Sequence, residues 1–147
     1  MASELQRRLI ERRERQELDR MLRTAPEVIT AHPLALAEVP DGALNAVRGF
    51  WSMSTEPLAT LNDEAGDQCL GPWVEELLAR HSFHTTAFLL TGLDLAPWIE
   101  FRMPPGWFTS IRQAKDSAWV FLRADLGAVA AVSEQEYRFE FFVSHLT

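Results

Sequence analysis

The chain has 147 residues, of which 47% are hydrophobic and 24% charged, with one cysteine and a formal net charge of −7. This composition is typical of one globular domain, residues 1–147, with a packed core, and it argues against a disordered chain. The single cysteine, Cys69, excludes an internal disulfide, and the lack of an apolar run of about 20 residues argues against a membrane span.

The charge is unevenly distributed. Residues 4–23 hold seven arginines and five acidic residues, which gives +2, while the remainder holds seven basic and sixteen acidic residues, which gives −9. We expect the acidic body to repel nucleic acid and membrane lipid and to attract a basic partner. Residues 1–25 are too charged for a signal peptide, so we expect a cytoplasmic location.

The first predicted element is a helix that starts at a capping box, Ser3 with Gln6, and continues to Arg23. Residues 11–17 contain no apolar side chain, so we expect a helix that buries its ends and leaves its middle in water. Two interpretations remain: an arm that docks on a partner or joins copies into a homo-oligomer, or an ordinary charged surface helix. Interleaved acids and missing aromatics argue against nucleic-acid binding.

The next stretch predicts two shorter helices between polar segments. Pro26–Asp41 reads as a connector with at most one helical turn, and Asp41–Trp51 as a helix with apolar residues at helical spacing. Thr55–Gly71 reads as a polar, turn-rich segment. Pro72 suits the first position of a helix that runs to Arg80.

The last third of the chain predicts strands. We expect strands at Phe83–Leu90, Trp98–Met103, Ala118–Ala124 and Tyr137–Val143, with a short helix at Trp107–Asp116; residues 127–132 suit either a strand or a helical turn. The final strand is the clearest, because alternate residues from Tyr137 onward are apolar and the intervening positions are Arg138, Glu140 and Phe142.

These elements predict an α+β fold, in which N-terminal helices pack on one face of a mostly antiparallel C-terminal β-sheet. We further expect Trp98–Met103 to pair antiparallel with the last strand, with Glu100 opposite Arg138, because this register joins opposite charges on one face and apolar side chains on the other.

Signatures of catalysis and cofactor binding are weak. Phosphate-binding glycine loops, the nucleophile elbow and the zinc-protease motif are missing. His81 and His84 suggest a metal site with the nearby glutamates only if helix geometry continues through them, and a charged His81 at a helix end is the simpler interpretation. Cys69 follows several acids, which favours a packing residue over a nucleophile. We therefore predict no metal, no cofactor and no catalytic residue.

Carboxylates that are close in sequence qualify for acid–base catalysis only by residue type. The pairs Asp63/Glu64, Glu75/Glu76 and Glu134/Glu136 are interpreted as solvated surface. The same acids suit a binding surface, and we predict that a group of them steers a basic partner: Asp63, Glu64, Asp67, Glu75 and Glu76.

The sequence therefore favours a non-enzymatic, protein-binding module of inhibitor or immunity type, which neutralises a basic protein by occlusion. The stiff turn Pro104-Pro105-Gly106 presents Trp107 and Phe108, which we predict to anchor the partner, although such aromatics also suit a core. Two other functions remain open. One is a small enzyme or ligand binder with a cavity lined by Trp51, Trp73, Trp98 and a histidine; the other is an assembly subunit of a phage or oligomeric particle.

Overall fold

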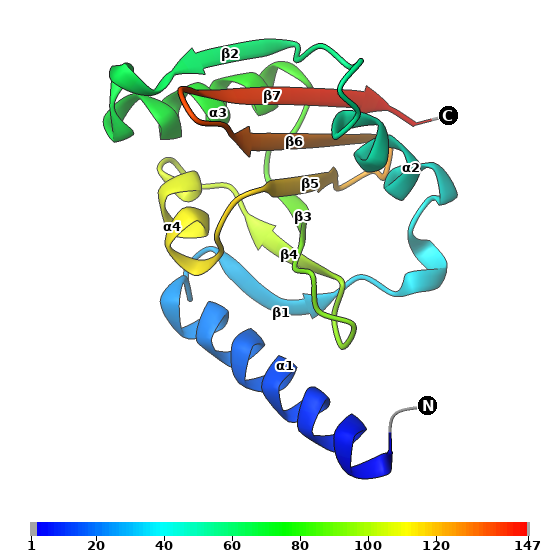
Figure 1. The fold of residues 1–147 in the computed structure, drawn as a ribbon. Coiled ribbons are helices and arrows are strands. Elements are labelled where there is room, and N and C mark those ends of the chain that lie inside the picture. Colours follow the sequence, from blue (N-terminus) through cyan, green and yellow to red (C-terminus); the bar gives the residue numbers. More distant parts are fainter. Residues whose placement is uncertain (1–2, 147) are drawn as a thin grey trace.

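The computed structural model describes residues 3–146, which form seven strands and four α-helices. The strands are β1 Ile29–Pro33, β2 Ala59–Asn62, β3 Thr86–Leu90, β4 Trp98–Arg102, β5 Trp119–Arg123, β6 Ala128–Glu134 and β7 Arg138–His145. The α-helices are α1 Glu4–Thr24, α2 Asp41–Phe50, α3 Asp67–Arg80 and α4 Trp107–Ala114, with short 3-10 helices η1 Leu36–Glu38 and η2 Asp63–Ala65. The predicted α+β class is confirmed (Figure 1).

The strands of this part of the chain form one antiparallel sheet in the order β1-β4-β3-β5-β6-β7-β2. The five interior strands come from the C-terminal half. Four of them were predicted, and the segment left open as a strand or a helical turn, residues 127–132, forms part of the strand β6. The two edge strands, β1 and β2, come from segments that the sequence presents as connectors. Edge strands need a partner on one side only and are kept short or proline-bearing, so their sequences carry little periodic signal.

The predicted pairing of the 98–103 strand with the last strand is wrong. β7 lies between β6 and β2, with Arg138 opposite Asn62, while β4 lies between β3 and β1. Strands that follow each other in the chain pair preferentially, and both β3–β4 and β6–β7 are such neighbours. The charge of Arg138 is instead met on its own strand, where its Nη2 donates to Glu140 Oε2 at 2.6 Å.

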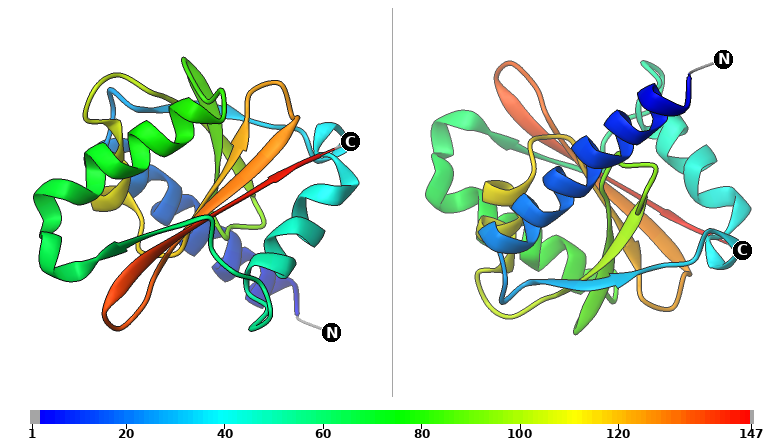
Figure 2. Two further views of the ribbon diagram at one scale, coloured as in Figure 1. Left: turned by 90° about the horizontal axis from the view of Figure 1, so that it is seen from above. Right: turned by 90° about the horizontal axis from the view of Figure 1, so that it is seen from below.

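Helices cover both faces of the sheet. On one face α1, α3 and α4 bury alternate residues of the strands, among them Phe101, Phe121 and Phe141. On the other face α2 packs on the intervening residues, which include Trp98, Leu122 and Phe142. Seen from above, α3 and α2 lie on opposite sides of β6 and β7 (Figure 2). The two-sided cover extends the predicted arrangement, because α2 takes the face that the sequence analysis left uncovered.

The helix predicted to start at Pro72 begins five residues earlier, at Asp67. Gly66, with φ +85°, reverses the chain after η2, and the helix follows at once. Pro72 is the sixth residue of this helix, beyond the four amides that lack intrahelical partners, so it removes one backbone hydrogen bond from the helix.

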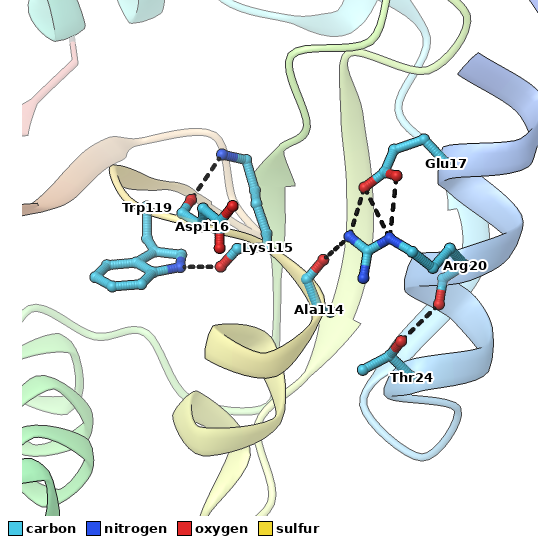
Figure 3. Close-up of polar contacts among 7 residues, drawn as sticks. All are labelled: Glu17, Arg20, Thr24, Ala114, Lys115, Asp116 and Trp119. Carbon is cyan, nitrogen blue, oxygen red and sulfur yellow. Dashed lines mark hydrogen bonds and ion pairs between the residues drawn. The ribbon is translucent and has the colours of Figure 1, made fainter. Parts of the chain in front are cut away.

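α1 has the predicted capping box, with Gln6 N bonded to Ser3 Oγ and Ser3 N to Gln6 Oε1. Its C-terminal half packs on β1 and α4, where Arg20 Nη2 donates to the carbonyl of Ala114 at 2.7 Å (Figure 3). Glu17 holds the same guanidinium, and this bond lowers the pKa of Glu17.

The expected burial of both ends of α1 is wrong for its N-terminal end. Met21 is buried, whereas Leu5, Leu9 and Ile10 are 67%, 48% and 48% exposed. The N-terminal end of the helix therefore extends past the body (Figure 1), and its apolar side chains lie in water.

Candidate functional site

The histidines and the cysteine that the sequence analysis considered differ in burial. His81 is half-buried with its ring 6.0 Å from the ring of His145, and burial, followed by the charge of His145, lowers the pKa of His81. His84 and Cys69 are exposed. Among residues 3–146, no three histidine, cysteine or acidic side chains lie together as a metal site would require.

The acidic side chains predicted to steer a partner lie on η2 and α3. Two of them engage other parts of the fold: Asp67 pairs with Arg112 at 3.1 Å, and Glu75 accepts the amide of Gly106 at 2.9 Å. Glu76 pairs with Arg80 on the same helix at 2.6 Å, and the bond from Gly106 to Glu75 links α3 to α4. The last of these bonds caps the start of α4 with a carboxylate, which a helix N-terminus favours. Asp63 and Glu64 are exposed on η2. Steering by this group remains a prediction.

The prediction that Trp107 and Phe108 anchor a partner does not agree with their burial. Their side chains are 3% and 0% exposed and contact one another and Phe121. The helix that follows the Pro-Pro-Gly turn lies on the sheet, so its aromatics fill the core and offer no surface to a partner.

The predicted ligand cavity lined by three tryptophans and a histidine is also not formed. Trp73 packs against the core on the α3 face, and Trp98 is buried on the α2 face. Trp51 is 43% exposed and lines a different cavity, at the C-terminal end of α2.

This cavity, here called the Trp51 cavity, has a volume of about 480 Å³. Its lining comes from the end of α2, the loop that follows, and the outer side of β6 and β7: Phe50, Trp51, Ser52, Met53, Thr55, Glu56, Pro57, Ser133, Gln135, Arg138, Glu140 and Phe142. Apolar and charged side chains therefore share one hollow on the molecular surface.

The apolar wall is an aromatic cluster. The rings of Phe50 and Phe142 stack with centroids 5.5 Å apart, and Trp51 meets Phe142 edge-on at 6.0 Å. Phe50 and Phe142 are buried and pack against Trp51, so they restrict the position of its ring. Met53 in the same wall is fully exposed and adds a flexible, polarisable side chain.

The loop that carries Trp51 and Met53 is fixed at both ends. Thr55 Oγ1 donates to the carbonyl of Gly49 at 2.7 Å, which satisfies an acceptor in the last turn of α2. At the far end, the amide of Leu58 donates to the carbonyl of Phe141 at 2.8 Å and leads the chain into β2. The aromatic wall is thus preorganised against the sheet.

The polar wall carries two carboxylates and one guanidinium. Glu140, whose side chain is 14% exposed, accepts a hydrogen bond from Arg138 at Oε2. Within residues 3–146 no hydrogen bond reaches its Oε1, and no buried side-chain polar atom there lacks a partner, so Oε1 is not fully buried. Glu56 adds a second carboxylate, and one negative charge remains in excess.

Sequence reasoning did not identify this site, although one signal for it was present. Phe142 falls on the otherwise polar side of the last strand, together with Arg138 and Glu140. A large aromatic at such a position indicates a second covered face, and the aromatic pair Phe50-Trp51 ends the helix that covers it.

Two groups with shifted pKa values lie outside these walls. The pKa of Lys115 is lowered by burial, and its ammonium group donates to the carbonyls of Asp116 and Ala118. Neither Lys115 nor His81 lines the Trp51 cavity, whose lining offers charge and aromatic surface.

The chain shows no significant similarity to any protein-family model, curated protein or solved structure. Within the part of the chain that the structure describes, no helix combines the length and the apolar character needed to cross a bilayer.

Proposed function

We propose that this protein is a protein-binding module whose Trp51 cavity receives a basic side chain, preferably an arginine, from a partner protein. One observation carries the proposal: an exposed tryptophan, supported by two buried phenylalanines, shares a cavity with the carboxylates of Glu56 and Glu140. In this proposal the partner is bound without any chemical change.

The preference for arginine follows from the two walls. A guanidinium stacks on an indole face and binds carboxylate oxygens through a planar fork, while an ammonium makes only the point-charge contact. Glu140 is already oriented by Arg138 through Oε2, which leaves Oε1 for the incoming cation. The excess negative charge of the lining and of the acidic body favours a basic partner over an acidic one.

The proposed role is inhibition of immunity type, in which the protein covers a basic surface of its partner. A rigid aromatic anchor with adjacent carboxylates suits such occlusion, because little conformational entropy is lost when the partner binds. The acidic side chains on η2 and α3 then serve to speed encounter from a distance, and this role predicts an association rate that falls with added salt.

Calorimetric titration with matched peptides tests the proposal. One peptide carries a central arginine among neutral residues, and its control carries citrulline, which has the same shape without the charge. We expect the arginine peptide to bind and the citrulline peptide to bind at least tenfold more weakly. Trp51→Ala should weaken binding by about 2- to 30-fold, the equivalent of about 0.5–2 kcal/mol of cation–π energy.

Two controls separate the cavity from general charge attraction. Glu140→Gln should weaken binding, whereas Glu27→Gln, which removes an equal charge from the exposed turn between α1 and β1, should leave it unchanged at moderate salt. Equal binding of both peptides would contradict the proposal. Tighter binding of free arginine amide than of the peptide would instead favour a small-molecule binder.

A further inference from the structure

The first ten residues of α1 form an arm that its own molecule does not cover (Figure 1). Residues 4–13 are all exposed. Within the described chain, the first side chain of this helix that bonds to the body is Glu14, which accepts the amides of Asp94 and Leu95 at 2.9 and 3.0 Å. The arm is therefore a helix held at its base and free along its length.

The exposed face of the arm is apolar and basic. Leu5 lies 16 residues from the buried Met21, which at 3.6 residues per turn places it about 160° around the helix, on the side away from the body. Leu9 follows one turn later on the same side, and Arg12 and Arg13 continue this face. Leu5 and Leu9 are 67% and 48% exposed.

The body carries a groove of the opposite charge. This Leu44 groove, about 640 Å³ in volume, lies between η1, the start of α2 and the turn that joins β3 to β4. Most of its lining is apolar, with Leu36 and Leu44 68% and 46% exposed. The charged residues in its lining are Asp41 and Asp94, and both are acidic.

We infer that the arm of one copy occupies the Leu44 groove of a second copy, in a reciprocal two-fold dimer. Leucines meet leucines at the centre of this contact, and the two arginines meet the two aspartates at its rim. Reciprocal exchange uses the same two surfaces on each copy and closes the assembly at two.

Other positions for the arm agree less well with the structure. The arm cannot turn back into its own groove, because α1 is one continuous helix through residues 4–24 whose exposed leucines point away from the body. Two arms laid face to face would bring the arginines of both copies together without an acid on that face. The groove shares no lining residue with the Trp51 cavity, so the dimer leaves that cavity open.

A charge-swap experiment tests the dimer. In one variant, Arg12→Glu with Arg13→Glu reverses the arm; in the other, Asp41→Arg with Asp94→Arg reverses the groove. Sedimentation velocity should show a dimer for the unmodified chain and monomers for each variant alone, because like charges then face each other. An equal mixture of the two variants should restore the dimer, since both contacts of the mixed pair again join opposite charges.

Matched controls guard against loss of folding and against general charge effects. Arg7→Glu with Arg15→Glu, on other faces of the same helix, should leave the dimer intact, as should Glu56→Gln in the Trp51 cavity. Circular dichroism should show unchanged helix content in every variant. A monomeric unmodified chain, variants that remain dimeric, or a mixture that remains monomeric would each overturn the inference.

Discussion

Replacement of Phe108 by alanine tests whether this residue is part of the core or anchors a binding partner. Its side chain is fully buried, and its ring meets those of Trp107, Trp119 and Phe121 at centroid distances of 5.7, 5.1 and 6.3 Å. Truncation of a buried phenylalanine costs about 3–5 kcal/mol, and edge-to-face aromatic pairs each add about 0.5–1.5 kcal/mol beyond burial. We therefore expect a loss at the upper end, about 4–5 kcal/mol of unfolding free energy.

The matched comparison is Trp51→Ala, which removes an aromatic that is 43% exposed. We expect it to cost about 1 kcal/mol of stability, because much of the ring is already in water. Trp51→Ala should affect the affinity for a basic partner more than it affects stability. Phe108→Ala should show the reverse: a large loss of stability with unchanged affinity in conditions where it is folded.

Equilibrium unfolding in urea, followed by circular dichroism, measures both stabilities by linear extrapolation. A loss of about 4–5 kcal/mol is a large part of the roughly 5–15 kcal/mol that holds a domain together, so Phe108→Leu provides a milder variant that retains the fold. A cost below about 1 kcal/mol for Phe108→Ala, together with lost affinity for a basic partner, would refute the reasoning and restore the anchor interpretation.

Three further changes test the supporting structure. Arg20→Ala removes the bond to the Ala114 carbonyl, and because the side chain of Arg20 is 45% exposed, we expect a loss of only about 1 kcal/mol of unfolding free energy. Amide hydrogen exchange at the α1–α4 contact should become faster. Unchanged exchange would contradict this role of Arg20. Gly106→Ala places a side chain at φ +86° and should cost about 1–3 kcal/mol in urea unfolding, whereas a neutral result would mean that the turn relaxes freely. Burial and the charge of His145 lower the folded-state pKa of His81, so the unfolded chain binds more protons than the folded chain as the pH falls from about 7 to 5. The free energy of unfolding should therefore decrease over this window. His81→Gln should reduce this pH dependence, and an unchanged dependence would assign it to other groups.

The sequence predicted the elements whose burial pattern is local. The alternation of Phe139, Phe141 and Val143 identified β7, and the Ser3 capping box identified the start of α1, because both signals depend on neighbouring residues alone. β1 and β2 were missed because a short edge strand is defined by the partner it joins, and that partner is far away in the chain.

The site depended on tertiary placement and was therefore harder to predict. The helical spacing of Trp107, Ile111 and Ala114 already indicated an inward face. That Phe108 is buried as well follows only from the packing of α4 on the sheet, which the spacing does not reveal. The Trp51 cavity joins residues from α2 and β7, about 90 positions apart. Neither local pattern reveals that the two segments meet.

The indole ¹H–¹⁵N spectrum of the five tryptophans tests the proposed binding site most directly. Titration with the arginine peptide should move the indole signal of Trp51 in a saturable manner and leave that of Trp98, which lines the Leu44 groove, in place. A titration that moves Trp98 while Trp51 stays fixed, or that moves neither, would contradict the assignment of the Trp51 cavity as the binding site.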